Sequence, residues 1–110
     1  MIVEDHATTR RALELMFRQS GWTVATAATM QDGLRLLESQ PNYVFLDLML
    51  PDGDGELLIQ KARALNSPTR FIVTTGCSDP TRLESIRKMS LHAVLQKPLN
   101  FAKIASVVAD

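Results

Sequence analysis

The sequence has little of several features that mark common classes of protein. It contains a single cysteine, Cys77, which excludes an internal disulfide and a cysteine-rich metal site. Twelve basic and twelve acidic residues leave a formal net charge of +0 at pH 7, which argues against nucleic acid or an anionic membrane as a bulk partner. No apolar run approaches the length of a membrane span. We therefore expect no membrane anchoring and no direct binding of nucleic acid.

The start of the chain also lacks the pattern of an export signal. Its apolar stub of three residues runs directly into Glu4 and Asp5, whereas a signal peptide needs a longer apolar segment. Because a lone thiol also fits a reducing compartment, we expect a cytoplasmic protein. The stub is short for a buried strand, so we further expect that residues precede Met1 in the complete protein.

What the sequence does contain suits one α/β domain. Of its 110 residues 45% are hydrophobic and 22% are charged, which fits a single domain that spans residues 1–110. Short apolar segments alternate with segments whose apolar residues recur at helical spacing. The expected strands are 1–3, 23–27, 43–46, 71–74 and 93–96. The expected helices are 8–19, 30–38, 56–65 and 80–88, followed by a last helix that carries Ile104, Val107 and Val108. Thr29, Asp79 and Asn100 are expected to cap helices.

These five alternations predict the architecture. Nearly unbroken apolar strands separated by helices indicate a parallel sheet that is covered on both faces. A doubly wound sheet of this kind places ligands beyond the carboxyl ends of its strands, where the strand order reverses. The run from Tyr43 to Gly55 marks this place, because four apolar residues lead straight to Asp47 and are followed by Pro51, two glycines and two more aspartates.

Reactive side chains follow four of the five expected strands. Glu4 and Asp5 come after the first strand, Asp47 after the third, Thr75 after the fourth and Lys97 after the fifth. If the spatial order of the strands is 2-1-3-4-5, these four ends lie side by side. Three carboxylates in one pocket cannot all stay ionised without a cation. Lys97 supplies one positive charge, and a hard dication would supply the rest.

The expected pocket has the oxygen-rich composition that Mg²⁺ prefers. The backbone carbonyl of Met49 is a further candidate ligand, whereas His6 is a poor one because oxygen sites rarely recruit imidazole. Such a pocket suits phosphoryl transfer, with Asp47 as the nucleophile that forms an acyl phosphate. Lys97 and the metal would neutralise the phosphoryl oxygens. The Thr75 hydroxyl could bond a phosphoryl oxygen that exists only after modification, which would make it a switch.

Four motifs together resemble the receiver domain of bacterial two-component response regulators. They are residues 2–5 (IVED), residues 46–55 (LDLMLPDGDG), Thr75-Gly76 and Lys97-Pro98. The resemblance implies a flavodoxin-like fold with strand order 2-1-3-4-5. It also implies Mg²⁺-dependent phosphorylation of Asp47 by a sensor histidine kinase or a histidine phosphotransfer protein.

The same resemblance implies roles for the other site residues and for partners. Glu4 and Asp5 would serve the metal, Lys97 would contact the phosphoryl group, and Thr75 would be the switch hydroxyl. The protein would be a signalling phosphoacceptor that acts on no free metabolite. Its phosphorylation would change binding to a downstream output domain or protein, and a homodimer on phosphorylation fits this pattern.

The sequence departs from the family pattern at several positions. Thr74 competes with Thr75 for the switch role, and we prefer Thr75 because the small Gly76 follows it. Val94 stands where the family often has an aromatic switch residue. No output domain follows within the 110 residues, so a stand-alone receiver and a piece excised from a longer regulator both stay open.

Other functions fit less well. A module that kept the fold but lost the switch is the main alternative, and Val94 leaves it open. A haloacid-type phosphatase would carry a second Asp where Met49 stands, and a nucleotide binder would want glycines at residues 4–7. Residues 52–56 lack the spacing of a calcium loop, so we expect a loop and a helix start there. Arg10, Arg11 and Arg18 are expected to form a solvated helix face.

Overall fold

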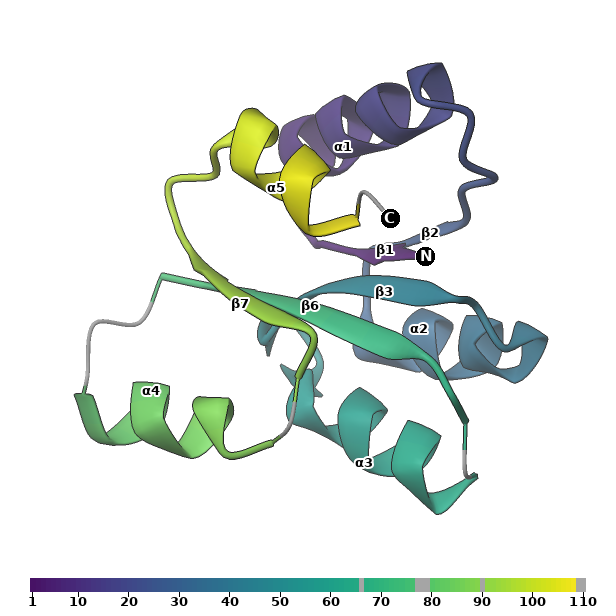
Figure 1. Ribbon diagram of the computed structural model, residues 1–110. Coiled ribbons are helices and arrows are strands. Elements are labelled where there is room, and N and C mark those ends of the chain that lie inside the picture. Colours follow the sequence, from purple (N-terminus) through teal and green to yellow (C-terminus); the bar gives the residue numbers. More distant parts are fainter. Residues whose placement is uncertain (66, 77–79, 90, 109–110) are drawn as a thin grey trace.

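A parallel sheet lies between two layers of helices in the computed structural model, which describes residues 1–65, 67–76, 80–89 and 91–108 (Figure 1). The strands are β1 (Ile2–Val3), β2 (Thr26–Ala27), β3 (Tyr43–Asp47), β4 (Met49–Leu50), β5 (Gly53–Asp54), β6 (Arg70–Thr75) and β7 (Ala93–Gln96). The helices are α1 (Ala7–Gln19), α2 (Met30–Leu36), a 3-10 turn (Leu37–Ser39), α3 (Glu56–Ala64), α4 (Pro80–Arg87) and α5 (Phe101–Val108).

The order of the strands confirms the predicted topology. The main sheet runs β2-β1-β3-β6-β7, and every strand pair in it is parallel. This is the 2-1-3-4-5 order of the doubly wound α/β fold, counted over the five predicted strands. In the register, Val3 lies opposite Leu46 and Asp47 lies opposite Thr74. The carboxyl ends of the four strands that carry predicted site residues therefore meet at one edge.

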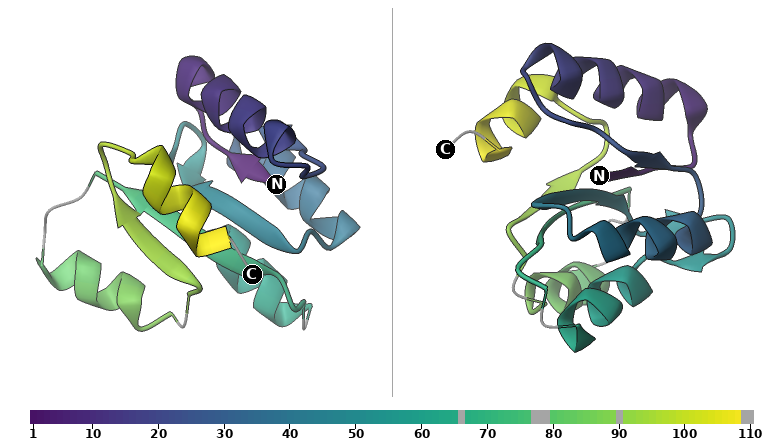
Figure 2. Two further views of the ribbon diagram at one scale, coloured as in Figure 1. Left: turned by 45° about the horizontal axis from the view of Figure 1, so that its top comes forward. Right: turned by 90° about the vertical axis from the view of Figure 1, so that its right-hand side faces the viewer.

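The helices cover the two faces of the sheet unequally. Helices α1 and α5 lie on one face, and α2, α3 and α4 lie on the other (Figure 2). Each face has its own core, because successive side chains of a strand point to opposite faces. The α1/α5 core contains Leu13, Phe17, Phe45, Ile72 and Ile104. The core on the other face contains Val44, Leu46, Leu58, Ile59, Val73 and Ile86.

The helix boundaries follow local signals in the sequence. The Thr29 side chain accepts a hydrogen bond from the Asp32 N–H at 3.1 Å, and Asn100 Oδ1 accepts one from the Lys103 N–H at 3.2 Å, so both predicted caps are confirmed. After α1 the chain turns at Gly21, whose φ of +92° favours glycine. The predicted cap Asp79 and the lone Cys77 lie outside the described residues.

The structure corrects the sequence-based prediction of several elements. Residues 52–56 are not only loop and helix start, since β4 and β5 pair as a two-stranded antiparallel hairpin. Leu65, which was expected to face inward, is 51% exposed because α3 ends before it. The edge strand β2 covers only two of the five residues predicted for it. Among the described residues, no helix combines the length and apolar character that a bilayer span requires.

Candidate functional site: an acidic pocket at the carboxyl edge of the sheet

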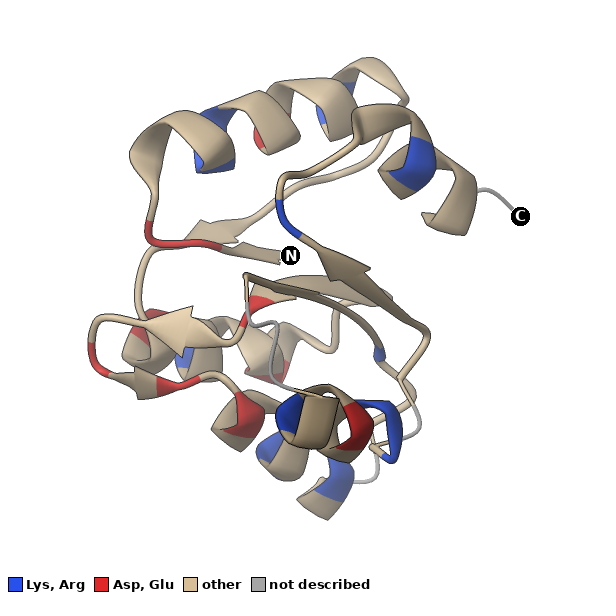
Figure 3. Ribbon diagram, turned by 90° about the vertical axis from the view of Figure 1, so that its left-hand side faces the viewer, with Lys and Arg blue, Asp and Glu red and all other residues tan. Residues whose placement is uncertain are grey.

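Three carboxylates gather where β1 and β3 end. Each of Glu4, Asp5 and Asp47 offers one carboxylate oxygen, and these oxygens all lie within 4.8 Å of one another. Acidic positions mark the ends of β1 and β3 and the β4–β5 hairpin at this edge (Figure 3). The parallel register brings the first two side chains to Asp47 across more than forty residues of sequence. Close carboxylates of this kind repel one another unless a cation compensates their charge.

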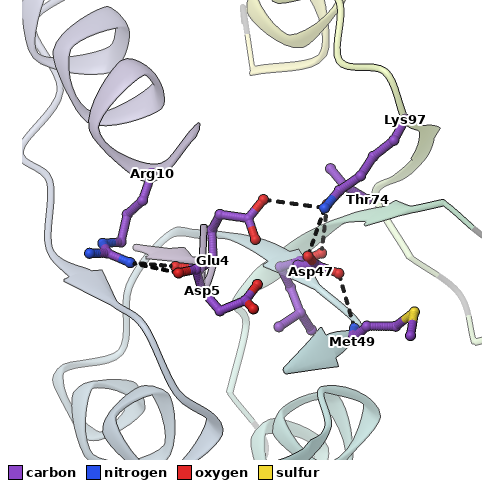
Figure 4. Close-up of polar contacts among 8 residues, drawn as sticks. Glu4, Asp5, Arg10, Asp47, Met49, Thr74 and Lys97 are labelled. Carbon is purple, nitrogen blue, oxygen red and sulfur yellow. Dashed lines mark hydrogen bonds and ion pairs between the residues drawn. The ribbon is translucent and has the colours of Figure 1, made fainter. Parts of the chain in front are cut away.

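Lys97 supplies part of that compensation. Its Nζ lies 2.8 Å from Asp47 Oδ2 and 3.3 Å from Glu4 Oε1 (Figure 4). Burial lowers the pKa of Lys97, but the neighbouring Asp47 and Glu4 carboxylates outweigh burial and hold this pKa above its ordinary value. The ammonium group is therefore charged at neutral pH and forms ion pairs with two acids at once. One positive charge still faces three carboxyl groups.

Glu4 is the most deeply buried of the three acids. It is 1% exposed, and its Oε2 has no hydrogen-bond partner among the described residues. Burial, followed by the nearby Asp47 carboxylate, raises the pKa of Glu4 to about 7. A buried carboxylate oxygen without a partner is costly for the fold. Its position beside two further acids is the feature that a bound cation would explain.

Asp47 is held from two sides. It is the last residue of β3 and is 5% exposed, and its Oδ1 accepts a hydrogen bond from the Met49 N–H at 3.0 Å. Oδ2 faces Lys97, so each oxygen has one protein partner and keeps a free lone pair. The Met49 side chain is 74% exposed at the mouth of the pocket. The predicted role of the Met49 carbonyl as a metal ligand stays a prediction.

The two threonines at the end of β6 take different positions. Thr74 lies level with Asp47 in the register, and its hydroxyl donates to the Leu46 carbonyl at 3.4 Å. Thr75 is one residue further along and is 3% exposed, and strand alternation turns its side chain to the face that α4 covers. The Lys97 N–H donates to the Thr75 carbonyl at 2.9 Å. The switch role of Thr75 stays a prediction.

The donor chemistry of the pocket suits a hard divalent cation. Its ligand atoms are carboxylate oxygens from Glu4, Asp5 and Asp47, two of them buried and one exposed, and oxygen donors of this type are what Mg²⁺ and Ca²⁺ bind. Such an ion would provide a partner for the Glu4 Oε2 atom, which has no hydrogen-bond partner among the described residues. His6 lies outside this group and is exposed at the start of α1.

Two arginines near the site were not identified from the sequence. Arg10 was expected on the solvated face of α1, but its Nη1 donates to the Glu4 carbonyl at 2.9 Å and to the Asp5 carbonyl at 3.4 Å. Arg11 and Arg18 lie exposed as predicted. Arg82 of α4 forms ion pairs with Asp54 and Glu56. Backbone acceptors and contacts between distant loops leave no signal in sequence spacing, which is why these roles were missed.

Comparisons with known proteins agree with this geometry. The profile of the response regulator receiver domain matches residues 1–109. The TorCAD operon transcriptional regulatory protein TorR of Escherichia coli O157:H7 is 32% identical over 107 residues, which are 94% of this chain and 45% of TorR. The chain spans less than half the length of the first curated relatives that it matches.

Solved structures share the fold. The signal receiver domain of a putative Luxo repressor protein from Vibrio parahaemolyticus has a TM-score of 0.89 at 23% identity, over 97% of this chain and 83% of that one. A response regulator protein from Burkholderia pseudomallei, solved with a phosphorylated aspartic acid, a calcium ion and citrate, has a TM-score of 0.85 at 22% identity, over 98% of this chain and 64% of that one. The receiver-domain profile matches residues 1–109, which are nearly the whole chain. The chain therefore belongs to the response regulator receiver domain family.

Proposed function

We propose that this receiver domain is the phosphoacceptor of a two-component phosphorelay and that Asp47 receives the phosphoryl group. The observation that carries the proposal is the Asp47 carboxylate, which is paired with Lys97 at 2.8 Å and surrounded by further carboxylates within 4.8 Å. A carboxylate with a positioned ammonium group and two further carboxylates that could share a cation suits attack on phosphorus.

The phosphoryl donor is a phosphohistidine of a sensor histidine kinase or of a histidine phosphotransfer protein. An Asp47 carboxylate oxygen attacks the phosphorus, a P–O bond forms, and the P–N bond to the imidazole breaks. The imidazole nitrogen leaves with the electron pair and takes up a proton from solvent, so atoms and charge balance. Lys97 Nζ, which pairs with Asp47 in this structure, moves onto a phosphoryl oxygen and stabilises its charge. The domain transfers the phosphoryl group to itself and releases no modified metabolite as an end product.

Mg²⁺ is the proposed cofactor of this transfer. Glu4, Asp5, Asp47 and the backbone carbonyl of Met49 would hold it. When bound, the ion neutralises the phosphoryl oxygens and the crowded carboxylates. Support comes from the unpartnered Oε2 of Glu4 and from the Burkholderia response regulator, which carries a phosphorylated aspartic acid and a calcium ion.

An intact-mass experiment tests the proposal directly. Wild-type protein incubated with Mg²⁺ and acetyl phosphate should gain one phosphoryl group, whereas Asp47→Asn should gain none because the amide is not a nucleophile here. Asp32→Asn is the matched control, since Asp32 is a surface acid of α2 that pairs with Arg35, and it should be phosphorylated like wild type. Phosphate on the Asp47→Asn variant, or transfer that is indifferent to chelation of Mg²⁺, would refute the assignment.

Thr75 is the proposed switch residue. Its side chain is buried at the end of β6, on the sheet face that α4 covers. A hydrogen bond from its hydroxyl to phospho-Asp47 would therefore shift the end of β6 and affect the packing of α4 on this face. Thr75→Ala should still accept phosphate, yet its α4 and β7 amides should no longer change their hydrogen exchange on phosphorylation. Thr74→Ala is the control and should keep this change. The opposite result would move the switch to Thr74.

A binding module that does not respond to phosphorylation is the second candidate. Val94 favours it, because this half-buried side chain packs against the α2/α3/α4 core instead of offering an aromatic ring that could rotate. In that case the wild-type protein would accept phosphate without any change in α4 or β7. The same exchange experiment therefore separates the two functions.

The domain spans residues 1–110, and the first curated relatives are more than twice as long as the segments that they share with it. A stand-alone receiver and one domain of a longer response regulator both fit the proposed function. An output domain or a separate downstream protein reads its phosphorylation state, and phosphorylation promotes a homodimer. The proposed place of action is the cytoplasm.

A further inference from the structure

Arg10 reaches back from the second turn of α1 to the loop that carries two of the three acids. One terminal nitrogen, Nη1, donates to the carbonyl oxygens of both Glu4 and Asp5, at 2.9 and 3.4 Å (Figure 4). The guanidinium thus contacts the backbone and not the carboxylates. Its side chain is half-buried, unlike its neighbour Arg11, which projects into solvent and pairs with Glu14.

The Glu4 side chain is also held by its ion pair with Lys97, but Asp5 has few other restraints among the described residues. His6, the N-cap residue of α1, makes no side-chain capping bond, and the first turn of α1 contains no acidic residue. The Glu4 N–H is still bound to the sheet through the Ala27 carbonyl at 3.0 Å, but Asp5 follows beyond the last ladder bond and is exposed. The direction of the Asp5 carboxylate therefore depends on the backbone that Arg10 holds.

We infer that Arg10 is a positioning residue of the metal site, which fixes the Glu4–Asp5 backbone so that both carboxylates face Asp47 before a cation binds. The inference rests on the proposed Mg²⁺-dependent function. A preorganised loop saves the ordering cost that metal binding would otherwise carry. Charge alone would act in the opposite direction, because a guanidinium close to the pocket repels a dication. If Arg10 acts by geometry, removing its guanidinium weakens Mg²⁺ binding, and if it acts by charge, removing it strengthens Mg²⁺ binding.

Isothermal titration of Mg²⁺ into the wild-type protein and three variants tests this inference. Arg10→Gln should raise the Kd for Mg²⁺ about tenfold, in the range typical of groups that orient metal ligands. Arg10→Lys should also weaken binding, because lysine keeps the charge but is shorter and does not hold its nitrogen in the rigid plane of a guanidinium. Arg11→Gln removes the same charge one residue away and should change Kd by less than about twofold.

A second readout separates positioning from general damage to the fold. At saturating Mg²⁺ Arg10→Gln should be phosphorylated by acetyl phosphate to the wild-type extent, while at limiting Mg²⁺ it should lag behind. A merely structural role would lower the extent at both concentrations. If Arg10→Gln does not fold, as judged by urea unfolding, Arg10→Lys provides the same comparison.

The outcomes are distinct. Unchanged or tighter Mg²⁺ binding by Arg10→Gln overturns the inference, and so does an equal loss of affinity in Arg11→Gln, since the loss would then not depend on the contacts that Arg10 makes with the Glu4 and Asp5 carbonyls. A wild-type protein that is phosphorylated and binds Mg²⁺ leaves the proposed function intact in those cases. A wild-type protein that binds no Mg²⁺ at all removes the metal from the proposed function and overturns this inference with it.

Discussion

The two ends of the central sheet bury different kinds of residue. At the carboxyl end lie all the buried polar or charged side chains of the described residues, which are Glu4, Asp47, Thr74 and Thr75. At the amino end, mainly apolar residues line an open pocket of about 450 Å³, and the half-buried aromatic side chains of Trp22 and Tyr43 are among them. These two rings meet edge to face at 5.5 Å.

The two ends of the sheet contribute differently to the stability of the fold. Aromatic pairs contribute about 0.5–1.5 kcal/mol beyond the area that they bury, so the packing at the amino end adds stability. The carboxyl end does the reverse, because a buried, partnerless carboxylate oxygen costs free energy. The chain tolerates this cost at one edge because packing elsewhere supplies the stability.

The largest expected effect comes from the apolar side of this comparison. Phe45 is 3% exposed, contacts Phe17 at a ring distance of 6.4 Å, and precedes Asp47 by two residues. Phe45→Ala should lower the free energy of unfolding by about 3–5 kcal/mol, because it leaves a void in the α1/α5 core. Urea unfolding measures this loss, and the exposed Leu15 gives the control, Leu15→Ala, with a change below about 0.5 kcal/mol.

The same variant can break the comparison. Folded Phe45→Ala protein should still accept phosphate on Asp47 at saturating Mg²⁺, since the substitution removes no group of the acidic pocket. If the folded fraction were not phosphorylated, the packing around Phe45 and the acidic cluster at the carboxyl end would be energetically coupled and would not act independently.

A smaller effect is expected at the carboxyl end, with the opposite sign. The pKa of Glu4 rises from 4.5 to about 7 on folding, so the folded state binds this proton more tightly than the unfolded state. Without metal, stability should therefore fall as pH rises from about 4.5 to about 7. Glu4→Gln should remove this slope and stabilise the metal-free protein at neutral pH by on the order of 1 kcal/mol.

Urea unfolding in EDTA over this pH range gives the measurement. Wild type and Glu4→Gln should be equally stable below pH 4.5, the ordinary carboxyl pKa, and should diverge above it. Mg²⁺ should stabilise wild type more than the variant. Parallel pH profiles of wild type and Glu4→Gln would show that folding does not raise the pKa of Glu4.

The smallest effect concerns an exposed acid at the same edge. Asp52 in the β4–β5 turn accepts hydrogen bonds from the N–H groups of Met30 at 2.8 Å and Gln31 at 3.0 Å, at the start of α2. The Met30 N–H first, and then that of Gln31, lower the pKa of Asp52. Its stabilisation is therefore present above the ordinary pKa and is lost as pH falls through the lowered one.

Asp52→Asn keeps the shape of the side chain but has a single acceptor oxygen. The amides of α2 should exchange faster in this variant at neutral pH, and the difference from wild type should disappear in acid. Asp32→Asn, on the same helix, serves as the control for a general loss of charge. Unchanged exchange in Asp52→Asn would mean that Thr29 alone caps α2.

The fold was predictable because its signals are local and repeated. Apolar strands such as 43–46 and 71–74, separated by amphipathic helices, leave a parallel doubly wound sheet as the simplest solution. The predicted caps Thr29 and Asn100 were confirmed because capping depends on residues three apart. Strand ends were less accurate, since β3 includes Asp47 and β6 includes Thr75.

The hairpin and the arginines were not predictable in the same way. Strands β4 and β5 pair through the backbone over two residues each. The glycine, proline and aspartate residues in and around them are typical of turns, so the sequence indicates a loop there. Arg10 bonds to backbone carbonyls, and Arg82 reaches Asp54 and Glu56 from another helix. No periodicity or spacing records contacts of these kinds.

The sequence by itself determined which side chains follow the strand ends, and therefore that Glu4, Asp5, Asp47 and Lys97 share one edge, because parallel strands with right-handed crossovers place their carboxyl ends together. Only the tertiary structure decided that Glu4 is buried while Asp5 is exposed, and that Lys97 pairs with two acids. Burial and contact distance depend on how helices and loops from distant parts of the chain close over the edge, and the order of residues does not specify that closure.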